Sequence, residues 1–154
     1  MSTARTDQLR SFTYGLLRLA RIYRREVNRA LVEQGLSDSR AFPVLQVARS
    51  GGGMRQGVLA EELGLEGPSL VRLLDQICAA GLLERRDDPT DGRAKTLHIT
   101  EAGRMLAADI EKILRDLRGR LLADVSNADL AAALRAFDVL EKALEAAEAK
   151  APRP

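Results

Sequence analysis

The sequence predicts a mainly α-helical fold with one short β-hairpin, and three observations lead to that prediction. Apolar residues recur at three- and four-residue spacing along most of the chain, which is the period of an amphipathic helix. Aromatic residues make up only 3% of the sequence and Trp is absent, so Leu, Ala, Val and Ile must build the core. A helical stretch that ends at Gly81 runs directly into two strand-like segments separated by a charged turn.

The middle of the chain is its most informative part. A predicted helix over residues 68–80 is followed by a strand-like segment at 82–85, a charged turn at 87–93 and a second strand-like segment at 96–99. A helix followed by a hairpin with an arginine near its tip is the order of a winged helix-turn-helix. In that fold the helix enters the DNA major groove and the hairpin arginine reaches the adjacent minor groove. The order therefore predicts double-stranded DNA as a partner.

Five further helices are expected, which makes six in all. The predicted ranges are 8–34, 39–50, 56–63, 101–123 and 127–149. Gly35 ends the first of them, and short polar residues can cap three of the others, 39–50, 101–123 and 127–149, at their N-termini. These candidate caps are Ser37 or Asp38, Thr100, and Ser126 or Asn127.

The helices expected at both ends of the chain are long and carry apolar stripes, but the sequence offers no second globular body for them to pack on. This predicts a homodimer built from both termini. We expect an N-terminal dimerisation helix over residues 1–34, a DNA-binding domain over 35–100 and C-terminal dimerisation helices over 101–150.

Composition excludes several classes of protein. The chain has 154 residues, enough for one domain with helical extensions. Cys78 is the single cysteine, so no intrachain disulfide can form and a reducing compartment fits. No segment has the pattern of a signal peptide, and none approaches the roughly 18 apolar residues of a membrane span. We therefore expect a cytoplasmic protein that does not engage a membrane.

The charge balance limits the kind of DNA binding that is possible. The formal net charge is only +2, and residues 35–100 hold eight basic and nine acidic residues. That balance disfavours a protein that coats DNA without regard to sequence. It is compatible with a site-specific binder whose few cations lie on one face.

Several segments resemble the MarR (multiple antibiotic resistance regulator) family of bacterial transcription factors. They are residues 59–65 (LAEELGL), 68–75 (PSLVRLLD), 81–85 (GLLER), 87–93 (DDPTDGR) and 97–103 (LHITEAG). The resemblance implies a homodimeric winged helix-turn-helix that binds a pseudo-palindromic operator. Members usually repress neighbouring genes and release DNA when a small ligand, often phenolic or an aromatic carboxylate, binds; some respond instead to cysteine oxidation.

Arg72 is the leading candidate for reading DNA bases, because a guanidinium can pair through two hydrogen bonds with guanine O6 and N7. Ser69 and Gln76 fall on the same helix face and can donate to phosphates or base edges. The resembled family often has Ser or Thr just before its third helix, where it caps the helix and touches a phosphate. Arg55 and Gln56 hold that place here, and either can make the phosphate contact instead.

Arg93 is the candidate for the minor groove, since a narrow A·T-rich groove has an enhanced negative potential. Asp91 can hold Arg93 in position, and Lys95 is a further candidate for a phosphate contact. An ordinary charged hairpin turn is the alternative explanation for these residues.

An effector pocket is expected where the dimerisation helices meet the winged domain. Arginines there can pair with a carboxylate and aromatic rings can stack on a ligand. The candidates are Tyr14, Arg18, Tyr23, Arg40 and Phe42, each of which can equally be core or surface.

Two alternatives keep the fold and change the function. Cys78 can be a redox sensor, although a small buried apolar role is more usual for a lone cysteine. The near-neutral 35–100 region can instead serve only protein association. The sequence shows no nucleophile and base pair, phosphate loop or paired acids, so we expect no enzyme, no catalytic residue and no cofactor. His98 and Cys78 alone cannot supply the four ligands of a structural zinc, so no metal is expected.

Overall fold

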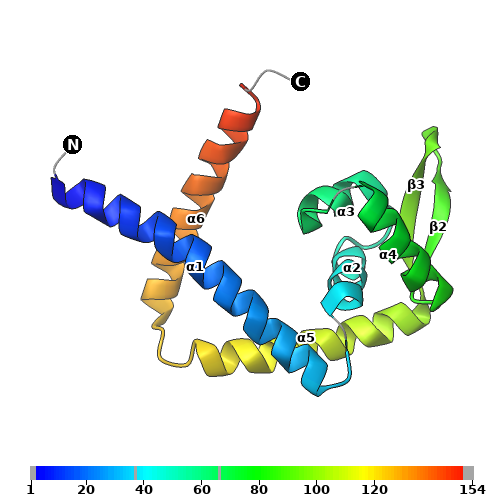
Figure 1. Ribbon diagram of the computed structural model, residues 1–154, viewed down its shortest axis with the longest axis horizontal. Coiled ribbons are helices and arrows are strands. Elements are labelled where there is room, and N and C mark those ends of the chain that lie inside the picture. The colour runs from blue at the N-terminus through cyan, green and yellow to red at the C-terminus, as the bar shows by residue number, and fades with distance from the viewer. Residues whose placement is uncertain (1–2, 37, 66, 151–154) are drawn as a thin grey trace. The chain divides into compact units, whose positions relative to one another are not determined.

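The computed structural model describes residues 3–36, 38–65 and 67–150, and the chain divides into two compact units, residues 1–117 and 118–154. The predicted fold class, a mainly helical chain with a small β-wing, is confirmed (Figure 1). The elements are α1 (Thr3–Glu33), α2 (Asp38–Arg49), β1 (Met54–Arg55), α3 (Gln56–Leu63), α4 (Gly67–Ala79), β2 (Leu83–Asp88), β3 (Asp91–Ile99), α5 (Glu101–Leu121) and α6 (Asn127–Glu148).

The sheet has three antiparallel strands in the order β1-β3-β2. Leu97 in β3 lies opposite Met54 on one side and Arg85 on the other, so one row of residues crosses the whole sheet. The two-residue strand β1 was not predicted, because Gly51, Gly52 and Gly53 precede it and two residues carry no alternation. It positions the start of α3 beside the hairpin.

The hairpin strands are longer than predicted. Residues 87–88 and 91–93, expected in the turn, belong to β2 and β3, which leaves a short turn at Pro89 and Thr90. Two interactions hold this tighter turn: Asp88 Oδ1 accepts hydrogen bonds from Thr90 N at 2.8 Å and from Thr90 Oγ1 at 2.6 Å. Asp87 and Lys95 lie opposite each other and form an ion pair, and opposite charges at such positions favour strand pairing.

The core of the first unit is built from α1, α2, α3, α4, α5 and the sheet, and α2 places Ala41, Val44, Leu45 and Val47 in it. Leu70, Leu74 and Ile77, which the helical spacing places on the inner face of α4, are almost fully buried. Val27 and Leu31 from α1 join the same cluster, as do Leu97 and residues of α5. The buried residues of α4 recur at four- and three-residue spacing, so the helix has one inner face and presents the opposite face to solvent.

Two of the predicted N-caps are confirmed. Thr100 Oγ1 accepts a hydrogen bond from Gly103 N at 3.0 Å, and Ser126 Oγ accepts one from Asp129 N at 3.1 Å. Ser37 lies outside the described residues, and Asp38 is the first residue of α2. Gly35 follows α1 with φ +74°, the left-handed conformation that favours glycine at a helix end.

Long stretches of the terminal helices expose apolar side chains. In α1 only Val27 and Leu31 are buried. The exposed apolar residues of α1 include Leu9, Phe12, Tyr14, Leu17, Leu19 and Tyr23. In the second unit α6 exposes Leu130, Leu134, Phe137, Val139 and Leu144. Within the part of the chain that the structure describes, no helix combines the length and apolar character needed to cross a membrane.

Candidate nucleic-acid interface

The outer face of α4 carries the three side chains predicted to meet DNA. Ser69, Arg72 and Gln76 are all exposed, opposite the buried Leu70, Leu74 and Ile77. Arg72 forms no hydrogen bond or ion pair with any residue that the structure describes. The carboxylate of Asp75, three residues later in the same helix, pairs with Arg85. The Arg72 guanidinium is therefore available to a ligand.

Most other cations of the winged region are paired with acids. Arg55 pairs with Asp88, Arg85 with Asp75, Arg86 with Glu84, and Lys95 with Asp87. This pairing explains how a region with nearly equal numbers of acids and bases can still present a free guanidinium. The acids pair with cations around the sheet, whereas Arg72 on α4 meets no acid among the described residues.

Arg55 occupies the N-cap position of α3 with φ −68° and ψ 142°, and its side chain makes no capping hydrogen bond. Instead of capping α3, the Arg55 guanidinium contacts the hairpin formed by β2 and β3. Arg55 Nε donates to Asp88 Oδ2 at 2.7 Å, and Nη2 donates to Thr90 Oγ1 at 3.2 Å. Arg55 therefore ties the start of α3 to the hairpin turn, and half of its side chain remains exposed.

Asp88 is the centre of this connection and is only 7% exposed. The hydrogen bonds from the Thr90 hydroxyl and from the Thr90 backbone N–H, with a further contribution from Arg55, lower the pKa of Asp88 to about 2. The carboxylate is therefore ionised at neutral pH and holds the turn and Arg55 together.

Gln56 and Arg85 meet on the other side of α3. Arg85 Nε donates to Gln56 Oε1 at 2.7 Å, Nη1 donates to Asp75, and Nη2 donates to the carbonyl oxygen of Val71 at 3.3 Å. One guanidinium from β2 thus contacts both α3 and α4. No feature of the local sequence indicates this arrangement, since Gln56 and Arg85 are 29 residues apart.

Three of the predicted DNA-contacting residues line one hollow between the start of α3 and β3. Arg55, Gln56 and Lys95 lie there beside an open volume of about 410 Å³. The remaining lining residues are Gly57, Val58, Glu61 and Ala94. Arg93 is placed in β3 by its backbone, and its side chain lies outside the described residues. Asp91, its expected partner, is exposed at the first position of β3.

A small cavity lies among α1, α2, α3 and α4. Its volume is about 170 Å³, and it is lined by Arg24, Ser39, Phe42, Pro43, Leu63, Leu65 and Leu73. Of the predicted effector residues only Phe42 lines it; Tyr14, Arg18, Tyr23 and Arg40 are exposed and do not. The sequence did not single out Arg24, whose guanidinium carbon lies 5.9 Å from the centre of the Phe42 ring, because α1 carries several arginines on the side opposite its apolar stripe.

Cys78 and His98 both have half-buried positions. Burial raises the pKa of the Cys78 thiol; the Arg85 guanidinium opposes this effect and the Asp75 carboxylate adds to it. His98 Nε2 lies 3.1 Å from Thr96 Oγ1. Among the described residues no group of His, Cys, Asp and Glu side chains is arranged to hold a metal ion.

The chain matches known transcriptional regulators in sequence and in fold. A family model described as the MarR family matches residues 34–94. The crystal structure of the transcriptional regulator PA3341 aligns with a TM-score of 0.79 and 34% sequence identity, covering 87% of this chain and 98% of that one. A MarR-family transcriptional regulator from Rhodococcus sp. RHA1 aligns with a TM-score of 0.72 and 28% identity, covering 90% and 96%.

Two more distant structures share the fold. The S. aureus MepR–DNA complex aligns with a TM-score of 0.70 and 17% identity over 86% of this chain and 96% of that one. CouR from Rhodococcus jostii RHA1 bound to p-coumaroyl-CoA aligns with a TM-score of 0.70 and 23% identity over 84% and 90%.

The family match covers α2, α3, α4, β2 and the start of β3, which are the elements that carry the exposed Arg72 face and the hairpin. The 34% identity to a transcriptional regulator extends over most of the chain. This protein belongs to the MarR family of DNA-binding transcriptional regulators.

Proposed function

We propose that the protein is a homodimeric, site-specific repressor that leaves its operator when a small aromatic or phenolic carboxylate binds. The observation that carries the DNA-binding part is the guanidinium of Arg72 on the exposed face of α4, which has no partner among the residues that the structure describes. A free planar guanidinium on such a face suits bidentate recognition of guanine in the major groove. MepR, which has the same fold, is known as a complex with DNA.

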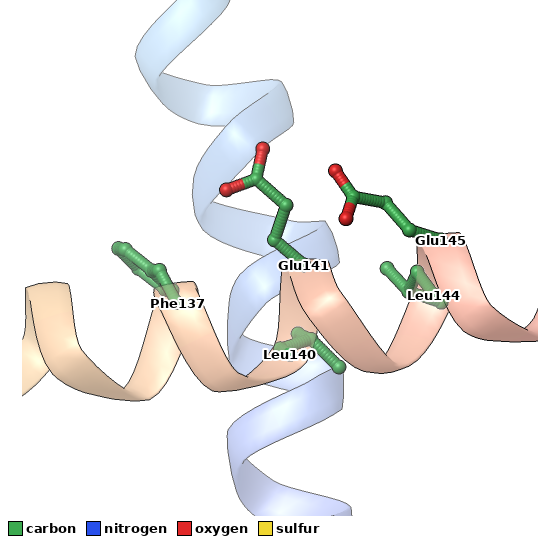
Figure 2. Close-up of a pocket in the computed structure, with 5 residues that line it drawn as sticks. All are labelled: Phe137, Leu140, Glu141, Leu144 and Glu145. Atoms are coloured by element: carbon green, nitrogen blue, oxygen red, sulfur yellow. The ribbon is translucent and has the colours of Figure 1, made fainter.

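The dimer is supported by apolar side chains that each unit leaves exposed. On α6, Phe137, Leu140 and Leu144 line a hollow of about 400 Å³, and Glu141 and Glu145 project beside them (Figure 2). Exposed apolar patches of this kind mark association surfaces. A second copy of the chain is the proposed partner, because two recognition helices about 34–36 Å apart match successive major grooves of DNA.

The cavity beside Phe42 is the proposed effector site. Its volume of about 170 Å³ is comparable with the roughly 150 Å³ cavity that accommodates benzene in another protein. Arg24 supplies a guanidinium for a carboxylate, and Leu73 connects the cavity to α4. A ligand that favours a different position of α4 would shift the population away from the DNA-binding state by its difference in affinity. CouR, which shares the fold, binds an aromatic acyl-CoA.

DNA binding is tested by fluorescence anisotropy with a duplex from the region upstream of the protein's own gene, beside a scrambled duplex, at near-physiological salt. We expect tight binding to the first duplex only. Arg72→Ala should weaken that binding by roughly 5- to 150-fold, equivalent to about 1–3 kcal/mol. Arg72→Lys keeps the charge but loses the planar fork, so it should retain the non-specific binding and lose discrimination. Equal affinity for both duplexes, or no change in Arg72→Ala, would contradict the proposal.

The effector site is tested separately with 4-hydroxybenzoate as the probe. Calorimetry should show binding to the wild type, and the same ligand should release DNA in the anisotropy assay. Arg24→Gln should weaken ligand binding, whereas Arg21→Gln, a matched change at another exposed arginine of α1, should not. Binding that is equal in both variants would place the effector elsewhere.

A further inference from the structure

We propose that Arg85 is a positioning residue for DNA recognition, because its guanidinium fixes the turn of α4 that carries Arg72. The inference rests on the proposed role of α4 in binding DNA. Arg85 is placed in β2, outside the recognition helix, and only 26% of its side chain is exposed. Each of the three nitrogen atoms of its guanidinium donates a hydrogen bond to an acceptor in α3 or α4.

The acceptors on α4 bracket Arg72. Val71 and Asp75 are four residues apart, so they stand at the two ends of one α-helical turn. Arg85 Nη2 reaches the carbonyl oxygen of Val71 at 3.3 Å, and Nη1 reaches the carboxylate of Asp75. A planar guanidinium that holds both ends of a turn restricts sliding and rotation of that turn.

The backbone of Arg85 is held in the three-stranded sheet. Arg85 lies opposite Leu97 in the sheet, and Leu97 lies opposite Met54, so the Arg85 backbone belongs to a row that crosses all three strands. Leu97 is fully buried in the core. Arg85 Nε also donates to Gln56 at the start of α3. Arg85 therefore adds a polar link from the sheet and α3 to the exposed side of α4, beside the apolar contacts of Leu70, Leu74 and Ile77 on its buried side.

Arg72 depends on this arrangement because it has no partner among the described residues that could orient it. The position of α4 therefore sets the point from which the Arg72 side chain reaches a base edge. Recognition requires placement to within about 0.5 Å, so a small displacement of the turn costs discrimination. Arg85 also neutralises Asp75, whose side chain is 59% exposed on the helix that would face phosphates.

The test compares Arg85→Gln with Arg86→Gln in the anisotropy assay described above. Arg86 is the matched control, since it is the next residue in β2, carries the same charge and, among the described residues, pairs with Glu84 of its own strand. We expect Arg85→Gln to lower the ratio of operator to scrambled affinity about tenfold, or ~1.4 kcal/mol. Arg86→Gln should leave the ratio unchanged. The slope of log affinity against log salt should stay at the wild-type value in Arg85→Gln, whereas loss of a phosphate contact would reduce it by about 0.9.

The effect of the unpaired Asp75 carboxylate is separated with Asp75→Asn. The double variant Arg85→Gln, Asp75→Asn should still discriminate less well than Asp75→Asn alone, because the contacts to Val71 and Gln56 remain lost. Discrimination restored to the Asp75→Asn level would overturn the inference and leave Arg85 as a charge neutraliser. The inference would also be overturned if Arg85→Gln reduced the slope of log affinity against log salt and weakened binding to both duplexes by the same factor.

Amide hydrogen exchange without DNA separates failure of this inference from failure of the proposed function. Exchange over residues 71–75 should be faster in Arg85→Gln than in Arg86→Gln, while residues of α5 retain wild-type protection and show that the variant is folded. Equal exchange in both variants would refute the positioning role even if the wild type binds DNA. A wild type that binds no duplex, with the exchange difference present, would refute only the proposed function.

Discussion

A β-carbon added to Gly103 would lie 2.1 Å from the carbonyl oxygen of Leu82. The first turn of α5 therefore touches the backbone that joins α4 to β2. Thr100 completes this junction: its Oγ1 lies 2.6 Å from the Gly81 oxygen and 3.0 Å from the Leu82 oxygen, and it accepts a hydrogen bond from Gly103 N. The Thr-x-x-Gly segment thus fastens α5 to the end of the recognition helix.

Gly103→Ala should destabilise the protein although alanine is the better helix former by about 1 kcal/mol. The added methyl group must displace backbone, and overpacking of this kind costs typically about 1–3 kcal/mol. Urea denaturation should show a lower midpoint with an unchanged slope. Gly119→Ala in the same helix is the control, because a β-carbon there meets nothing within 4 Å, and it should leave the protein as stable or more stable. Equal midpoints for the two variants would contradict this account.

The sequence predicted this junction only in part. It placed Thr100 as a cap and Gly81 as the end of a helix, since both follow from local rules that connect residue type to backbone conformation. The reason for glycine at position 103 lies in a contact with Leu82, 21 positions earlier in the chain. Spacing along a helix cannot reveal that Gly103 lies against the backbone of Leu82. The resemblance to the family includes this glycine in its pattern but does not explain why glycine is needed there.

Stability should fall in acid because of Asp88. Its pKa in the folded protein is about 2, against an ordinary value of 3.8, so the ionised carboxylate favours the folded state. A lowered pKa contributes stability that is present above pH ~4 and is lost as the pH falls from about 4 to 2. In urea denaturation at pH 7 the wild type should be more stable than Asp88→Asn. This difference should shrink steadily between pH 4 and the lowest accessible pH.

Asp87→Asn is the control for that pH profile. Asp87 is exposed and pairs with Lys95 across the hairpin, so its replacement should have a small effect at every pH. If Asp88→Asn lowers the free energy of unfolding by the same amount at pH 7 and at pH 2.5, the ionisation of the Asp88 carboxylate does not stabilise the turn.

Cys78 should react slowly with thiol reagents. Burial raises the pKa of its thiol, and the thiolate is the reactive form, so the reaction at pH 7 should be slower than that of a free cysteine. We expect slow modification by an aromatic disulfide reagent in the native protein and rapid modification after unfolding in urea. Peroxide should leave DNA affinity unchanged. Fast native modification, or a peroxide response that Cys78→Ala abolishes, would favour the redox alternative.

The candidate interface shows why site residues were harder to predict than the fold. The exposure of Ser69, Arg72 and Gln76 follows from helical periodicity, which local sequence encodes. The hydrogen bonds of Arg55 and Gln56 do not follow from local sequence, because their partners, Asp88 and Arg85, are 33 and 29 residues away in the chain. Charge counting could not decide which of the described cations pair with acids, since that depends on which acid each one meets across the sheet.

The exposed apolar stripe of α6 should hold the proposed dimer together. Leu130, Leu134 and Phe137 share one helix face by their spacing, and Val139 falls on the opposite face although it is also exposed. Leu134→Asp should convert the dimer to monomers in sedimentation experiments. Burial of a leucine contributes roughly 1.5–3 kcal/mol. In a symmetric dimer the substitution removes this contribution from both subunits. We therefore expect a dimer dissociation constant at least about a hundredfold higher.

Val139→Asp provides the matched control for this experiment, because it introduces the same charge on the same helix without touching the stripe. It should remain dimeric and should bind the operator duplex as the wild type does. Leu134→Asp should retain its helical circular dichroism and lose most of its operator affinity, since a monomer presents one recognition helix instead of two. If both variants stay dimeric, α6 is not the dimerisation surface, and the exposed apolar residues of α1 would have to supply it.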